Sequence, residues 1–135
     1  MAKVERVTYF IIKVEDKPGA LLKVMQDLRS KSIGLAGLWG YGTGDGMARV
    51  FAVGKNPDKL RDALKASGLL SEEGIGFFIK GADRTGALLK PLEALATAGV
   101  NIDVTDAIAV GGRFGCFIFV NTTEVEKAAE ALGSK

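Results

Sequence analysis

The sequence contains no histidine, and this absence excludes a large group of functions. Catalytic triads with histidine, imidazole proton transfer near neutral pH and histidine-based metal sites all require a side chain that the chain lacks. The single cysteine, Cys116, leaves no partner for an intrachain disulfide and too few thiolates for a cysteine-only zinc site. We therefore expect no metal site, no cofactor and a reducing, cytoplasmic setting.

The net charge is low, and the sequence has no long apolar run. The 135 residues carry 18 Lys and Arg against 16 Asp and Glu, and the formal charge of +2 is too low for binding nucleic acid mainly by neutralising phosphates. No apolar run approaches the roughly 18 residues of a membrane span, and the first residues lack the apolar core of a signal peptide. With 47% hydrophobic residues, the chain is expected to fold as a soluble protein without contact to membranes.

The chain contains an internal repeat. A shift of 67 positions aligns residues 10–23 with residues 77–90, and nine of these fourteen positions are identical. The same offset aligns Leu28 with Leu95 and Val53 with Val120 without a gap. The sequence therefore predicts two copies of one unit, residues 1–70 and residues 71–135.

The hydrophobic period changes in the same order within each copy, which predicts strand, helix, strand, strand, helix. The expected elements are 7–14, a helix from Pro18 that ends before Gly34, 35–41, 47–53 and a helix from Asn56, then 75–81, 86–98, 101–110, 115–121 and 123–132. Only Leu69–Ser71 could supply a further strand to the first copy, so a final strand would be short, missing or borrowed. Pro91 lies past the first turn of the predicted helix 86–98, which predicts a bend near residues 87–91.

These elements predict an α+β protein. We expect two ferredoxin-like βαββαβ units with a reduced or missing last strand, antiparallel sheets and helices on one face. Runs such as Phe77–Ile79 and Phe117–Val120 are apolar on both sides of a strand, so the second face of the sheet is also expected to be covered. Because large exposed apolar patches are rare on monomers, the sequence favours a second sheet or a partner subunit there, and hence a homodimer.

Two segments of the unit resemble the signatures of the ACT-domain family. The first is Asp16-Lys17-Pro18-Gly19-Ala20-Leu21 at a helix start, and the second is Ala98-Gly99-Val100-Asn101-Ile102 before a strand. The resemblance covers nearly the whole chain, twice, although Thr85 replaces the usual proline and Gly34 stands where the second copy has Asn101. It implies a tandem, stand-alone pair of regulatory βαββαβ modules that bind amino acids at interfaces between modules and control partner enzymes.

The chemistry of a free amino acid agrees with the residues that this resemblance implies. A carboxylate needs clustered donors, which a helix N-terminus supplies, and an ammonium needs an acceptor, which Asp16, Asp83 or Asn101 supplies. Gly19 and Gly86 would let a ligand approach the backbone closely. The candidate ligand-binding residues are Asp16, Pro18, Gly19, Ala20, Leu21, Asp83, Thr85, Gly86, Ala87, Leu88, Asn101 and Ile102.

Structural interpretations of the same residues remain open. Asp before a helix is commonly its N-cap, a glycine can serve only its turn, and Asn101 can hold a turn through bonds to nearby backbone. Cys116, in an apolar strand, is expected to be a small core residue. Trp39 is either a ligand-stacking ring or part of a core or interface.

Three classes of function compete. The leading hypothesis is an amino-acid-binding regulatory module that senses a small amino acid and acts on a partner metabolic enzyme or regulator through a ligand-linked quaternary change. The alternatives are an RNA-binding ferredoxin-like protein, because Arg113–Phe119 loosely resembles an RNP1 segment, and a ligand-free dimerisation module. Enzymatic activity is not expected: Gly40–Gly46 fits no phosphate-loop pattern, and it precedes a strand rather than a helix.

Overall fold

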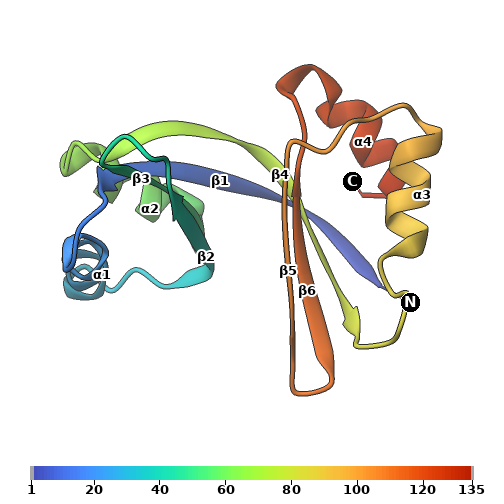
Figure 1. Cartoon of the computed structure of the whole chain (residues 1–135), viewed down its shortest axis with the longest axis horizontal. Helices are drawn as coiled ribbons and strands as arrows, with labels where there is room; N and C mark the ends of the chain where they lie inside the picture. Colours follow the sequence, from blue (N-terminus) through green and yellow to red (C-terminus); the bar gives the residue numbers. More distant parts are fainter. Residues whose placement is uncertain (1, 135) are drawn as a thin grey trace. The chain divides into compact units, whose positions relative to one another are not determined.

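The structure is a computed structural model that describes residues 2–134. Its strands and helices follow one another in the order that the repeat predicts (Figure 1). The bounds are β1 Lys3–Glu15, α1 Ala20–Ser30, β2 Leu35–Gly42, β3 Met47–Gly54, α2 Pro57–Ala66, β4 Leu70–Ala82, α3 Leu89–Thr97, β5 Val104–Val110, β6 Arg113–Phe119, the short 3-10 helix η1 Thr122–Glu124 and α4 Val125–Leu132. The sheet has the strand order β2-β3-β1-β4-β6-β5. The predicted α+β class with an antiparallel sheet is confirmed.

The described chain divides into two compact units. One consists of residues 8–74 and is called the 8–74 unit; the other joins residues 2–7 to residues 75–134 and is called the 75–134 unit. In chain order the 8–74 unit contains most of β1, then α1, β2, β3, α2 and the first part of β4. The 75–134 unit contains the rest of β4, then α3, β5, β6 and α4, together with the first residues of β1.

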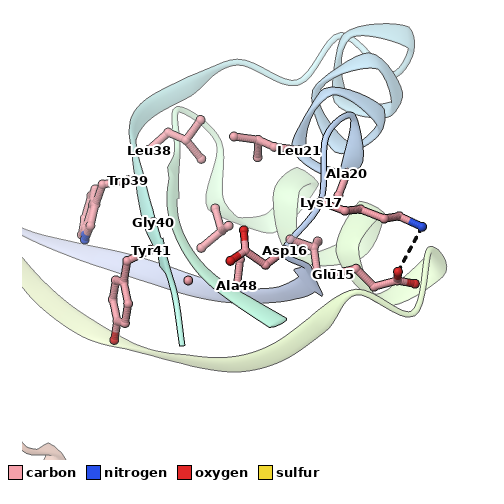
Figure 2. A pocket seen from close by; sticks show the side chains of 13 residues that line it. Glu15, Asp16, Lys17, Ala20, Leu21, Leu38, Trp39, Gly40, Tyr41 and Ala48 are labelled. Atoms are coloured by element: carbon pink, nitrogen blue, oxygen red, sulfur yellow. Dashed lines mark ion pairs between the residues drawn. The ribbon is translucent and has the colours of Figure 1, made fainter. Parts of the chain in front are cut away.

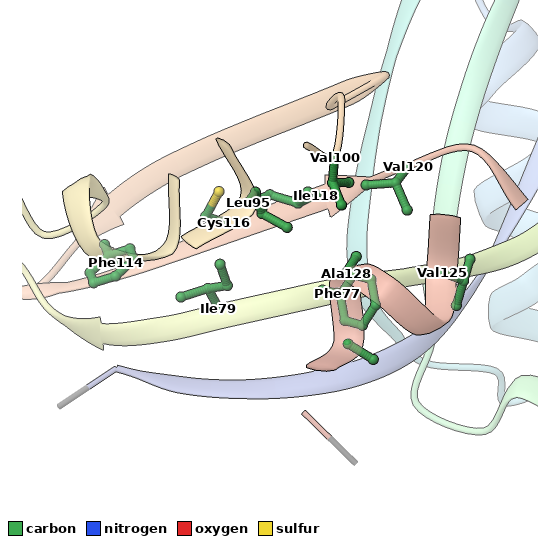
Figure 3. Packing of buried hydrophobic residues seen from close by; sticks show 11 residues of the cluster. Phe77, Ile79, Leu95, Val100, Phe114, Cys116, Ile118, Val120, Val125 and Ala128 are labelled. Atoms are coloured by element: carbon green, nitrogen blue, oxygen red, sulfur yellow. The ribbon is translucent and has the colours of Figure 1, made fainter. Parts of the chain in front are cut away.

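Each unit packs its helices on one face of its strands. In the 8–74 unit, Leu28 of α1 and Leu64 of α2 pack with Phe10, Ile12 and other apolar side chains of the strands. In the 75–134 unit, the corresponding core is formed by α3, α4, β4 and β6, and Figure 3 shows its side chains. Cys116 is 1% exposed in this core, which confirms its expected role there, and burial raises the pKa of its thiol.

The opposite face of the strands is also apolar, as predicted. Phe51 is 1% exposed, and the ring of Trp39 stacks on it with a centroid distance of 5.5 Å. In the 75–134 unit, the rings of Phe78 and Phe117 stack at 4.5 Å. Apolar side chains on both faces of these strands are thus packed against other apolar groups, which explains why the strand sequences are apolar on both sides.

In the first copy, the last strand is not reduced to the predicted Leu69–Ser71. β4 is 13 residues long and begins at Leu70, so Ser71–Gly74 belong to a strand although they comprise three polar residues and a glycine. Arg61 contacts both carboxylate oxygens of Glu73, and Arg49 pairs with Glu72, so salt bridges hold this segment within the 8–74 unit. Strand formation here depends on tertiary contacts, which outweigh the low β-propensity of the segment.

The first residues of β1 extend the sheet of the 75–134 unit, beside β4. Arg6 donates two hydrogen bonds to the carboxylate of Glu126 in α4, at 3.0 and 3.1 Å, and Lys80 forms an ion pair with Glu5. The second copy thus has a neighbouring strand from the opposite end of the chain. Of the expected possibilities, a short, missing or borrowed strand, this segment corresponds to the borrowed one.

The predicted bend at Pro91 is also wrong. α3 begins at Leu89 rather than at residue 86, and residues 85–88 form a turn before it. Pro91 therefore lies within the first turn of the helix, where a backbone N–H has no intrahelical acceptor. By contrast, the helix start at Asn56 is confirmed, because its side chain accepts a hydrogen bond from the backbone N–H of Lys59 at 3.2 Å.

Candidate functional site

Each unit has a pocket between the loop that precedes its first helix and its edge strand. The first pocket, of about 400 Å³, lies in the 8–74 unit between the loop Glu15–Lys17, the start of α1 and Leu38–Gly42 of β2 (Figure 2). The second pocket, of about 270 Å³, lies in the 75–134 unit between Asp83, the turn before α3 and Ala107–Ala109 of β5. The repeat therefore places two hollows at equivalent positions.

The two loops are held in the same way. The backbone N–H of Asp16 donates to the carbonyl of Gly46, and that of Asp83 donates to the carbonyl of Gly112, each at 2.9 Å. Both bonds tie the end of the first strand of a unit to the hairpin between the next two. Neither aspartate caps a helix, because the N-cap residues of α1 and α3 are Gly19 and Leu88. The alternative interpretation of the two aspartates as N-caps is therefore wrong.

The carboxylate of Asp16 borders the first pocket and lies against Gly42 of β2 (Figure 2). A Cβ atom at position 42 would collide with Asp16 Oδ2, so the glycine provides the space for this carboxylate. The neighbouring Lys17 pairs with Glu15 at 3.0 Å, whereas Asp16 has no ion-pair partner within residues 2–134. The loop can thus offer a carboxylate to a cationic group in the pocket.

Gly19 and Gly86 have left-handed backbone conformations, with φ of +86° and +79°. Residues with a Cβ rarely adopt this conformation, so the turn at the start of each first helix requires glycine. The backbone conformation of the turn is therefore sufficient to explain both glycines, as the structural interpretation proposed.

The structure brings some of the predicted residues together and separates others. Asp16, Ala20 and Leu21 line the first pocket, and Asp83, Gly86, Ala87 and Leu88 line the second. Pro18 and Gly19 lie on the exposed turn beside the first pocket without lining it. Thr85 lines a separate groove of the 75–134 unit between α3 and α4.

Asn101 and Ile102 lie outside both pockets. The Asn101 side chain is exposed, and its amide donates to the carbonyl of Ile102 and to Asp103 Oδ1 at 3.4 Å. Ile102 packs against the core of the 75–134 unit. The bond to nearby backbone corresponds to the structural interpretation of Asn101, and within one chain this residue is not part of the Asp83 pocket.

Sequence reasoning missed the strand residues that form the floor of the first pocket. Leu38, Gly40 and Gly42 of β2 and Ala48 of β3 line it. The signal was present in Gly40 and Gly42, because glycines two residues apart in a strand lie on one face and mark a close approach. The sequence predicted a strand at 35–41, but it was examined for ligand contacts only at Trp39 and as a phosphate loop at Gly40–Gly46.

Comparisons with known proteins support the fold. No family model and no curated protein matches the sequence. A solved structure of a Bacteroides thetaiotaomicron protein is 24% identical, has a TM-score of 0.82 and aligns over 96% of this chain and 88% of its own. The regulatory subunits of aspartate kinase from Thermus thermophilus, in a ligand-free form, and from Thermus flavus are 18% and 19% identical, with TM-scores of 0.65 and 0.61. Each aligns over 98% of this chain and 94% of its own.

The chain shares their fold. This likeness supports the ACT-like fold that the two sequence signatures imply. Across residues 2–134, no helix combines the length and the apolar composition that crossing a bilayer requires.

Proposed function

We propose that the protein is a tandem pair of ferredoxin-like ACT-type units, with repeat boundaries near 1–70 and 71–135, that binds a small free amino acid. The observation that carries the proposal is the pair of equivalent pockets, each with an aspartate at its mouth and the start of a helix beside it. Asp16 or Asp83 accepts hydrogen bonds from the ligand ammonium. Unpaired backbone N–H groups at the helix start donate to its carboxylate.

The role is regulatory rather than catalytic. The similar Thermus proteins are regulatory subunits of aspartate kinase, which supports a module that acts on a metabolic enzyme or another regulator in the cytoplasm. Ligand binding acts by linkage: the ligand shifts an equilibrium between quaternary arrangements by its difference in affinity for them.

A homodimer provides these quaternary arrangements. β5 is an edge strand, and its Ile108 and Val110 side chains are 68% and 69% exposed. An exposed apolar edge strand readily pairs with a second chain, which supports dimerisation along this edge. Pairing there would bring a second copy next to Asn101 and Ile102, which precede β5.

RNA binding receives less support. Base stacking requires exposed rings on the sheet, whereas Phe117 and Phe119 are buried. A ligand-free dimerisation module remains the alternative that the binding experiment tests directly.

The test is a thermal-shift screen of the full chain against the twenty amino acids, followed by calorimetry. At about 100 times its dissociation constant a ligand raises the free energy of unfolding by roughly 2.7 kcal/mol, which gives a clear rise in Tm. Asp83→Ala and Asn101→Ala are expected to reduce this rise, whereas Asp62→Ala, a change of an exposed acid on α2, leaves it unchanged. Absence of a shift with every amino acid would contradict the proposal and favour the ligand-free module.

A further inference from the structure

We infer that the two pockets differ in specificity, and that the first pocket binds an amino acid with a branched aliphatic side chain such as leucine. This inference rests on the proposed function, because it concerns the ligand of the same sites. The second pocket has the smaller volume and favours ligands with a smaller side chain. The argument comes from three positions at which the repeats differ in side-chain volume.

The floor of each pocket consists of the strand residues that face the helices. In β2, Gly40 and Gly42 lie opposite Val50 and Ala48 of β3. A Cβ atom at Gly40 would lie 3.0 Å from the carbonyl oxygen of Arg49, and Gly42 leaves room for the Asp16 carboxylate. Ala48 adds only a methyl group, so the side chains at these three floor positions are small or absent.

The equivalent positions of the 75–134 unit carry larger side chains. Ala107 and Ala109 of β5 replace the two glycines, and Phe114, which pairs with Ala109, replaces Ala48. All three line the second pocket, and its volume is about 270 Å³ against about 400 Å³ for the first. The larger side chains at these three positions agree with the smaller volume of the second pocket.

The walls of the first pocket define which side chain fits. Leu21 of α1 and Leu38 of β2 point toward each other across the hollow, as Figure 2 shows, and Val14 and Val50 also line it. The charged groups of the pocket, Asp16 and the paired Glu15 and Lys17, all belong to the loop at one end. A ligand whose ammonium lies at Asp16 therefore directs its side chain toward aliphatic walls. A charged or polar side chain would lose its hydration there without gaining a partner.

The additional carbon atoms of the leucine side chain, when buried in the pocket, determine how much more tightly leucine binds than alanine. Each methylene in an apolar pocket changes affinity by at least about tenfold when the walls contact it closely. For an open pocket we expect L-leucine to bind about 10 to 100 times more tightly than L-alanine.

The experiment measures dissociation constants of L-leucine and L-alanine by calorimetry on the full chain. Ala48→Phe introduces into the first pocket the phenylalanine side chain that Phe114 supplies in the second. We expect this change to reduce the affinity for leucine at least tenfold. Leucine should then no longer bind more tightly than alanine. Ala66→Phe is the matched control, because Ala66 is exposed at the end of α2 and lines neither pocket. This control is expected to bind leucine as the unchanged protein does.

A second variant covers the case that Ala48→Phe does not fold, which circular dichroism would reveal. Leu38→Ala removes one wall of the pocket at a residue that is 38% exposed, and it is expected to weaken leucine binding about five- to tenfold. Equal affinity for leucine and alanine, or unchanged leucine binding in folded Ala48→Phe, would overturn the inference and leave amino-acid binding itself intact. Absence of binding by any amino acid would overturn both.

Discussion

Arg6 and Glu126 form a bidentate ion pair in the 75–134 unit. The guanidinium group contacts both oxygens of the Glu126 carboxylate, and these hydrogen bonds hold the pKa of Glu126 below its ordinary value of 4.5. The pair joins two residues that are 120 positions apart, the start of β1 and α4. A single side chain therefore links the beginning of the chain to the last helix.

This ion pair predicts a pH dependence of stability. Folding favours the charged form of Glu126, so its contribution is complete above pH 4.5 and is lost as the pH falls below that value. We expect Glu126→Gln to reduce the loss of unfolding free energy between about pH 5 and pH 3, as measured by urea unfolding. Glu130→Gln, at an exposed residue of the same helix without an ion pair among residues 2–134, serves as the control. An identical pH profile for Glu126→Gln and the unchanged protein would contradict the assignment.

At the scale of elements, the first part of β4 shows how tertiary contacts produce a strand. Gly74 lies beneath the ring of Tyr9, and a Cβ atom added to it would be only 2.6 Å from Tyr9 Oη. An aromatic ring that covers a strand glycine compensates for the missing side chain. This packing adds to the salt bridges of Glu72 and Glu73 in fixing the position of the strand.

Gly74→Ala is expected to destabilise the protein by about 1 to 3 kcal/mol, because the methyl group displaces the Tyr9 ring. In Tyr9→Leu, where the ring is absent, the same change at position 74 should cost clearly less. The four proteins of this double-mutant cycle are compared by urea unfolding. Additive effects of the two substitutions would show that the ring does not determine the requirement for glycine.

The sequence predicts those elements whose signals are local. The cap Asn56 and the following Pro57 mark the start of α2, and the change of period in each copy gives the order of the elements. The sequence did not predict a strand at Glu72–Gly74, because its stability comes from Arg49, Arg61 and Tyr9, which are distant in sequence. Composition alone gives no sign of such pairing.

The candidate site was predicted in part for the same reason. The loops of Asp16 and Asp83 could be recognised because their residues are contiguous. The floor of the first pocket depends on the register of β2 against β3, which places Gly40, Gly42 and Ala48 on the side of α1. That register is a property of the folded sheet.

At the scale of the whole molecule, each unit is completed by a strand from the other repeat. Residues 2–7 belong with residues 75–134, and the first residues of β4 belong with residues 8–74. The division between the two units therefore falls within β1 and within β4.

Deletion of residues 2–7 is expected to weaken one unit selectively. It removes Arg6 and the strand beside β4. Amide hydrogens of β6 and α4 should therefore exchange faster, at most at the rate of unprotected amides. Amide hydrogens of β2 and β3 in the 8–74 unit should keep their protection. The measurement is native-state hydrogen exchange of the shortened and the full chain. Equal acceleration in both units would contradict this division.

The placement of the first strand residues also has a consequence for synthesis on the ribosome. The 8–74 unit has all of its elements once residue 74 has emerged, whereas Arg6 meets its partner only after Glu126 has emerged as well. At about 5 to 20 residues per second, the 52 residues between these points take roughly 3 to 10 s. During this interval Arg6 lacks its ion-pair partner, and residues 2–7 lack the strand and helix that later surround them.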